Sequence, residues 1–230
     1  MKNYKLSDET KTLFGGEVLH RIVATTTFTL ACGLTVNAGD VGGWIEKESN
    51  LSDNAWVFGD AQVYGNALVC DNALVFGNAQ VFGDARVSSS AWIYDRAKVS
   101  GNAWVHGSAE VCDDAQIFSN AEVTGSAVVC GDALVSGKAQ VAGNAEVCGD
   151  ALVFGYACVG DNARILDNAR VFNNAWVYGD AKIYDDAQVY GNAQISGATR
   201  VYGNSEVAGD TILSDNITVY NMTLGVGDPQ

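Results

Sequence analysis

A strict period of six residues constrains this chain more than any other feature of its sequence. From Ile45 to Val219 an aliphatic residue recurs at every sixth position, and each of these positions holds Val, Ile or Leu. Four residues after most of them stands an alanine, preceded by two residues that are mostly Gly, Asp, Asn or Ser. A short, fixed period of this kind is typical of a solenoid, in which identical coils stack on one another.

The chemistry of each hexad predicts how one coil is built. The aliphatic residue and its two flanking residues form a three-residue strand, with the aliphatic side chain inward and the flanking side chains outward. Gly, Asn and Asp tolerate positive φ, so they form the corner, where alanine points inward. Three hexads close a triangular coil of 18 residues, and strand spacing stacks the coils about 4.8 Å apart. The sequence therefore predicts an all-β, single-stranded parallel β-helix of about ten coils.

Two parts of the sequence carry a family resemblance. The repeats resemble those of hexapeptide-repeat proteins with a left-handed parallel β-helix, the fold of many bacterial acyltransferases. Tyr4–Ser7, Leu19–Ile22 and the Gly-Gly-Trp of Gly39–Ile45 resemble the opening of a group found in bacteria and their prophages, some of which are labelled transferases by fold alone. The left hand comes from this resemblance. General crossover rules favour a right hand, so a right-handed triangular β-helix stays as the alternative.

The repeat also divides the chain. Residues 1–44 lack the period and contain short apolar segments, which predict strands at Tyr4–Leu6, Val18–Leu30 and Gly33–Val36. We expect them to form an N-terminal β cap that covers the exposed strand edges of the solenoid. Residues 45–224 form the β-helix. Residues 225–230 are expected to be a frayed tail, because Gly225 falls where an aliphatic residue is due.

Composition restricts the compartment and the partners. The net charge is −14, which disfavours direct nucleic-acid binding, because neutralising phosphates requires clustered Lys and Arg. No 18-residue apolar run and no signal peptide are visible, so we expect a cytoplasmic protein that does not enter the membrane. Of the six cysteines, Cys112, Cys130 and Cys148 recur at the period of one coil, which stacks them about 5 Å from one another. In a cytoplasm we expect all six to be reduced thiols that act as small apolar residues.

Outward positions separated by one full coil form columns, and one face of the triangle gathers aromatic residues in its first three coils. We call this the aromatic face, and its six large apolar residues are Trp56, Phe58, Leu74, Phe76, Trp92 and Tyr94. Stacked aromatic residues stabilise adjacent strands, which would account for them without a partner. So large a patch on one flat face instead favours an interface, most simply with a second copy of the chain.

The other two faces differ from the aromatic face. A second face carries Tyr64, Phe82, Phe118, Phe154, Phe172 and Tyr190. The third face carries mostly small residues, including Ala142 and Gly160, and is the best candidate for close approach of a partner or ligand.

The sequence offers one catalytic candidate. His106 lies outward beside Trp104 and could act as the histidine base of a hexapeptide acyltransferase, which abstracts the acceptor proton. Neither an orienting carboxylate nor a loop leaving the coils can be assigned to it, so a surface histidine is the simpler interpretation. Carboxylates near one corner (Asp113, Asp114, Asp132, Asp150) could bind calcium. Turn chemistry alone explains them, so no metal and no cofactor are expected.

Three functions stay open at this stage. The first hypothesis is a non-catalytic, rigid binding or self-assembly module that forms a homo-oligomer through the aromatic face, with any foreign partner unidentified. The alternatives are an acyltransferase-like enzyme that uses His106, and an acidic decoy that imitates the charge of nucleic acid. The decoy requires carboxylates in a regular row along one edge. Arg96 interrupts the most acidic corner column.

Overall fold

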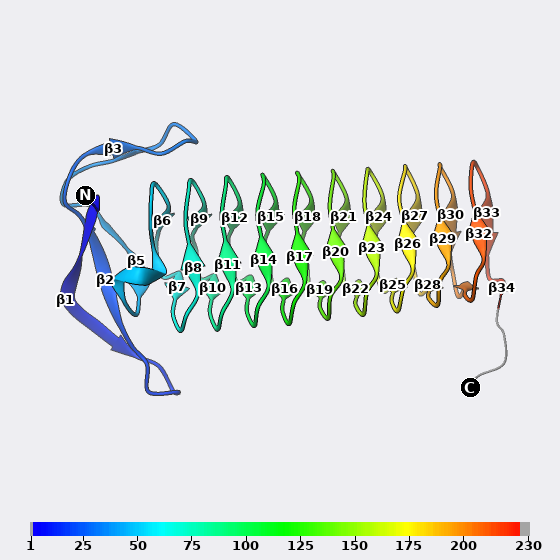
Figure 1. Cartoon of the computed structure of the whole chain (residues 1–230), viewed down its shortest axis with the longest axis horizontal. Helices are drawn as coiled ribbons and strands as arrows, with labels where there is room; N and C mark the ends of the chain where they lie inside the picture. The colour runs from blue at the N-terminus through cyan, green and yellow to red at the C-terminus, as the bar shows by residue number, and fades with distance from the viewer. Residues whose placement is uncertain (1, 226–230) are drawn as a thin grey trace.

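The computed structural model describes residues 2–225, and over these residues the chain is a rod of stacked β-coils (Figure 1). Successive coils pair in parallel register, as in Trp56 with Leu74 and Gln80 with Lys98. The predicted parallel β-solenoid is therefore confirmed, with three hexads in each coil. Ten coils give a rod about 48 Å long at the usual strand spacing.

Three parallel sheets form the faces of the rod over the described residues. The aromatic face contains β6 (Trp56–Val57), β9 (Leu74–Val75), β12 (Trp92–Ile93), β15 (Glu110–Val111), β18 (Val128–Val129), β21 (Glu146–Val147), β24 (Arg164–Ile165), β27 (Lys182–Ile183), β30 (Arg200–Tyr202) and β33 (Thr218–Tyr220). The third face contains β8 (Leu68–Val69), β11 (Arg86–Val87), β14 (Trp104–Val105), β17 (Glu122–Val123), β20 (Gln140–Val141), β23 (Cys158–Val159), β26 (Trp176–Val177), β29 (Gln194–Ile195) and β32 (Ile212–Leu213).

The second face continues into the N-terminal strands. It contains β1 (Tyr4–Thr12), β2 (Val18–Ala24), β5 (Val41–Ile45), β7 (Gln62–Val63), β10 (Gln80–Val81), β13 (Lys98–Val99), β16 (Gln116–Ile117), β19 (Leu134–Val135), β22 (Leu152–Val153), β25 (Arg170–Val171), β28 (Gln188–Val189), β31 (Glu206–Val207) and β34 (Thr223–Leu224). A separate hairpin pairs β3 (Phe28–Thr29) with β4 (Thr35–Val36), and a 3-10 turn, η1, spans Glu48–Asn50.

The core is the column of inward side chains that the period predicted. Aliphatic residues from Ile45 to Val219 are almost fully buried, and so are the corner alanines from Ala55 to Ala193. Where alanine gives way to Thr199 and Ser205, the replacements are equally buried. Ser205 satisfies its hydroxyl by donating to the carbonyl oxygen of Tyr202 at 2.6 Å, so the core pattern continues past the last alanines.

Corners show why the repeat uses Gly and Asp there. Gly125 has a φ of +75°, and a Cβ at this position would lie 2.6 Å from the carbonyl oxygen of Gly143 in the next coil. Asp113 adopts the same left-handed conformation with a φ of 57°. Its carboxylate accepts a hydrogen bond from the backbone N–H of Gly131, one coil later, at 2.9 Å. Corner aspartates therefore join successive coils, which gives the acidic residues a structural role.

The N-terminal strands lie across the first coil. β1 and β2 pair antiparallel, and β2 pairs antiparallel with β5, which also pairs in parallel with β7. Side chains at Gly42 and Gly43 would place Cβ atoms 2.5 Å from Ile22 and Val57, which explains the Gly-Gly-Trp segment. The predicted boundary between residues 44 and 45 thus falls inside β5.

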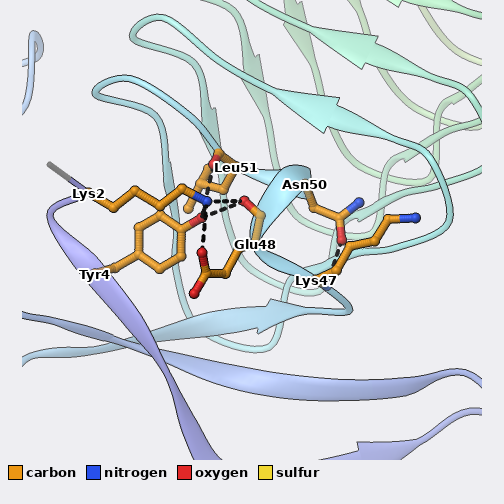
Figure 2. Close-up of polar contacts among 6 residues, drawn as sticks. All are labelled: Lys2, Tyr4, Lys47, Glu48, Asn50 and Leu51. Atoms are coloured by element: carbon orange, nitrogen blue, oxygen red, sulfur yellow. Dashed lines mark hydrogen bonds and ion pairs between the residues drawn. The ribbon is translucent and has the colours of Figure 1, made fainter.

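Polar contacts fasten β1 to the 3-10 turn (Figure 2). The hydroxyl of Tyr4 lies 2.9 Å from the carbonyl oxygens of both Glu48 and Leu51. Lys2 donates to the Glu48 carbonyl at 2.6 Å and pairs with its carboxylate at 3.3 Å. Burial raises the pKa of Tyr4 above its ordinary value of 10.0, because the charged phenolate would lose its solvent.

The structure corrects three details of the sequence prediction. The expected strand Val18–Leu30 ends at Ala24, because the chain turns into the β3–β4 hairpin. Most repeat strands are one residue shorter than predicted, as in Gln62–Val63. In the last coil Val207 pairs with Leu224, just short of a full period, so Leu224 takes the place expected for Gly225. Residues 226–230 of the expected frayed tail lie outside the described residues.

Candidate functional site

Two residues predicted to lie open on the aromatic face are buried. Trp56 is 1% exposed and Leu74 is 5% exposed. The hairpin of β3 and β4 covers them: the ring of Phe28 meets Trp56 edge-on at 5.4 Å, and Leu30 and Val36 belong to the same apolar cluster. Figure 1 shows this hairpin reaching along the first coils beside β6. The expectation that Trp56 and Leu74 lie open on this face was wrong, because a non-repeating segment of the same chain packs there.

The other four predicted residues of this face, Phe58, Phe76, Trp92 and Tyr94, are half-buried. Phe76 and Tyr94 stack with centroids 4.9 Å apart and ring planes 2° from parallel. A hollow of about 260 Å³ lies between Ala31 and Cys32 of the hairpin and Trp92 of the rod. Contacts with the hairpin and between stacked rings therefore cover much of the apolar surface of the aromatic face.

The third face carries a notch in its second half. Ala142 and Gly160 form its floor and the exposed side chains of Trp176 and Tyr178 form its wall, around a volume of about 310 Å³. Gly160 does not have positive φ, and a Cβ placed there would have no heavy atom within 4 Å, so the floor is open above it.

This part of the third face combines uncharged outward positions with exposed aromatic side chains. From β20 to β32 all its outward positions are uncharged: Gln140, Ala142, Cys158, Gly160, Trp176, Tyr178, Gln194, Ser196, Ile212 and Ser214. We call the outward residues of β20, β23, β26 and β29, with the residue that follows each strand, the neutral patch: Gln140, Ala142, Cys158, Gly160, Trp176, Tyr178, Gln194 and Ser196. Depletion of charge together with exposed Trp and Tyr is the composition found at the centre of protein interfaces.

His106 lies in a hydrogen-bonded row on the same face, towards the N-terminal end of the rod. Its Nε2 is 3.0 Å from a carboxylate oxygen of Glu122, and its Nδ1 is 3.2 Å from the hydroxyl of Thr124. The Trp104 ring stacks on the imidazole with centroids 4.0 Å apart. Glu122 thus supplies the carboxylate that the sequence analysis did not assign to His106.

The cysteine column differs from its prediction. Cys130 and Cys148 form a disulfide between adjacent coils, with Cα atoms 4.6 Å apart. The expectation of six reduced thiols was therefore wrong for this pair, because stacking at strand spacing places the two residues within the range that a disulfide needs. Cys112, the next residue in the column, is a buried thiol, and burial raises its pKa.

Acidic side chains meet at one corner of the first coils. Carboxylate oxygens of Asp53 and Asp71 and the Cys70 sulfur lie within 4.8 Å of one another. One Asp71 oxygen already accepts a hydrogen bond from the backbone N–H of Ser89 at 2.9 Å, as other corner aspartates do. We therefore assign these groups to the joining of coils.

The neutral patch was only partly predictable. Its small residues led to the third face being chosen as a contact surface, but Trp176 was missed as its wall. Trp176 stands in the outward column before the inward residue, whereas Tyr178 and Gly160 stand in the column after it. Trp176 could have been found from the sequence by considering the outward columns before and after the inward residue as one surface.

Comparison with known families agrees with the fold. A family model described as the YdcK beta solenoid repeat matches residues 61–75, 79–94, 163–179 and 187–205. A search of curated proteins gave no match. Over the described chain, no helix has the length and apolarity needed to cross a bilayer. The chain is a β-solenoid repeat protein, similar over these four stretches to the YdcK repeat.

Proposed function

We propose that this protein is a non-catalytic, rigid module for binding and self-assembly, and that a second copy of the chain docks on the neutral patch. The observation that carries the proposal is the pairing of a ridge and a notch on one uncharged surface. Trp176 and Tyr178 project next to the hollow over Ala142 and Gly160.

A twofold axis makes this surface self-complementary. In a twofold interface the same patch serves both copies. Each patch must therefore carry both a ridge and the notch that receives the partner's ridge. An axis between the levels of Gly160 and Tyr178 places each Tyr178 ridge over the partner's Gly160. It also brings Gln194 opposite the partner's Gln140, where the two amides can exchange hydrogen bonds.

Electrostatics favours the same pairing. Two copies of a chain with a net charge of −14 repel one another over most of their surfaces. The outward residues of the neutral patch are all uncharged, so acidic groups meet only along its corner edge, where Asp161 and Asp180 lie. A second copy is therefore a better match for this patch than a basic partner, which the acidic corners would attract instead.

The size of the contact predicts its strength. With the axis at this level six coils of each copy overlap. The contact is then about 29 Å long along the rod and at most about 20 Å wide, which is the length of one six-residue side. The resulting area, about 600 Å² per copy, is below the roughly 800 Å² of a standard interface. We therefore expect a reversible dimer that dissociates on dilution.

Light scattering after size exclusion tests the proposal over a range of protein concentrations. Wild type should pass from dimer mass to monomer mass on dilution, and the double variant Trp176→Ser, Tyr178→Ser should stay monomeric at every concentration. Trp104→Ser is the matched control, because Trp104 is 40% exposed on the same face but lies outside the overlap. A wild-type monomer at high concentration, or a double variant that dimerises like wild type, contradicts the proposal.

Acyl transfer is a second candidate, favoured by the row of Thr124, His106 and Glu122. If Glu122 accepts from Nε2–H, Nδ1 is left as an acceptor, which is the arrangement that a general base needs. Binding of coenzyme A measured by calorimetry, and lost in His106→Ala, would support this function. Absence of binding to the wild-type chain would remove it.

A further inference from the structure

The aromatic face holds a third cysteine in line with its disulfide. Cys112, Cys130 and Cys148 directly follow β15, β18 and β21, three neighbouring strands in parallel register. The backbone N–H of Cys112 donates to the Val129 carbonyl at 3.0 Å, and that of Cys130 donates to the Val147 carbonyl at 3.0 Å. The backbone register that relates Cys112 to Cys130 is therefore the same as the register that relates Cys130 to Cys148.

This repetition has a chemical consequence at the middle residue. Only Cys130 neighbours both of the other two cysteines, since Cys112 and Cys148 are two coils, about 9–10 Å, apart. A thiolate attacking a disulfide approaches from the side opposite to the bond that breaks. In the column Cys112 lies one coil before Cys130 and Cys148 lies one coil after it, so the attacking and leaving residues are on opposite sides of Cys130.

We infer that Cys112, Cys130 and Cys148 form a thiol–disulfide exchange site, in which one disulfide alternates between Cys130–Cys148 and Cys112–Cys130. The Cys112 thiolate attacks the sulfur of Cys130, a Cys112–Cys130 bond forms, and the Cys130–Cys148 bond breaks. The electron pair leaves with the Cys148 sulfur, which takes up the proton that Cys112 lost. The step needs no oxidant or reductant, because one disulfide and one thiol are present before and after it.

The surroundings of Cys112 set how fast this exchange runs. Burial raises the pKa of its thiol, and the carboxylates of Asp113, Asp95 and Glu110 raise it further, while the Tyr94 hydroxyl lowers it. The reactive species is the thiolate, so little of it is present near neutral pH. Below the thiol pKa, the exchange rate should rise about tenfold for each unit of pH.

Disulfide mapping on the full chain tests the inference. Wild-type protein carrying the Cys130–Cys148 bond is held at pH 7 or pH 9, quenched with acid, alkylated with N-ethylmaleimide and digested. A protease that cleaves at acidic residues separates the three cysteines, because Asp113, Glu122, Asp132 and Glu146 lie between them. Trypsin would leave Cys112 and Cys130 in one peptide.

The expected result is a peptide pair linking Cys112 to Cys130, which appears about a hundredfold faster at pH 9 than at pH 7 if the pKa lies above 9. Cys148→Ser, equilibrated with oxidised and reduced glutathione, should form the Cys112–Cys130 bond quantitatively, whereas Cys112→Ser should keep Cys130–Cys148. Cys32→Ser, at an exposed thiol of the β3–β4 hairpin, should behave as wild type.

Three results overturn the inference. Alkylated Cys112 and Cys130 in folded, glutathione-treated Cys148→Ser would mean that the second register cannot form. A wild-type map fixed at Cys130–Cys148 after prolonged incubation at pH 9 would mean that no exchange occurs. A wild-type chain that forms no bond at Cys130 under the same glutathione conditions would remove the site. Circular dichroism of each variant checks that the β-coils remain.

Discussion

Replacing Trp56 with alanine is expected to release the β3–β4 hairpin from the rod. Trp56 is 1% exposed and its indole packs between Phe28 of the hairpin, at 5.4 Å, and Phe58 of its own coil, at 6.2 Å. Truncation removes the surface on which Phe28 rests. The variant therefore tests whether the aromatic face binds the hairpin, as the structure has it, or is an open surface.

The expected cost follows from the area that the indole buries. An aromatic side chain of this size buries about 150–250 Å², which at about 25 cal/mol per Å² corresponds to about 4–6 kcal/mol. Measured truncations of buried Phe or Trp to Ala cost about 3–5 kcal/mol. Since solenoid coils contact only their neighbours, this loss should fall on the hairpin and first coil. A loss of about 4 kcal/mol is a factor of about 10³ in the opening equilibrium.

Amide hydrogen exchange measures that local opening directly. Within the hairpin, the N–H of Leu30 donates to the Leu34 carbonyl at 2.9 Å and the N–H of Gly33 donates to the Leu30 carbonyl at 2.8 Å. In Trp56→Ala both amides should exchange about 10³ times faster than in wild type, while amides near β27 keep their wild-type rates. Trp104→Ala is the control, because its 40% exposed indole lies on the third face, outside the apolar cluster that joins Trp56 to the hairpin. An increase of less than tenfold at Leu30 in folded Trp56→Ala would refute the reasoning.

Further predictions concern corners, cap and patch. Gly125→Ala should lower the free energy of urea unfolding by about 1–3 kcal/mol, because φ is +75° and the next coil's carbonyl leaves no room for Cβ. Gly160→Ala, with open space above it, should be neutral or stabilise by up to about 1 kcal/mol. Gly160→Leu should keep the fold but fill the notch, raising the dimer dissociation constant more than tenfold by analytical ultracentrifugation. Tyr4→Phe should cost about 1 kcal/mol, measured as faster exchange in β1. Because burial raises the pKa of Tyr4, its contribution is complete below pH 10 and is lost as pH rises through the raised value. This alkaline loosening should be absent from Tyr4→Phe.

The period of six predicted the rod well because it states which side chains face inward. Each aliphatic residue from Ile45 to Val219 can be placed inside from its number alone, and each is buried. Two positions separated by three hexads must be neighbours, so the columns were predictable too. The same arithmetic places Glu122 in the coil that follows that of His106, on the same face, so the carboxylate of that row was within reach of sequence reasoning.

What the sequence could not predict lies where the period carries no information. The hairpin that covers Trp56 belongs to the non-repeating segment, and nothing in the repeat specifies which face such a segment crosses. Column arithmetic places Cys130 beside both Cys112 and Cys148, and it does not decide which pair is bonded. The hand of the coil stays a prediction from family resemblance, because inward burial is the same for either hand.

The two proposed sites meet at one coil, and this determines how they can influence each other. The Cys130–Cys148 bond reaches the coil that contributes Gln140 and Ala142 to the neutral patch, whereas the Cys112–Cys130 bond stops one coil earlier. A disulfide acts mainly by constraining the unfolded chain, and the hydrogen bonds between these coils do not depend on it. Exchange should therefore leave the patch geometry and the dimer dissociation constant unchanged. Equal constants for Cys112→Ser and oxidised Cys148→Ser would indicate a rod too stiff to transmit the exchange. A difference of tenfold or more would mean that the bond deforms the coil it joins, and the disulfide would then regulate assembly.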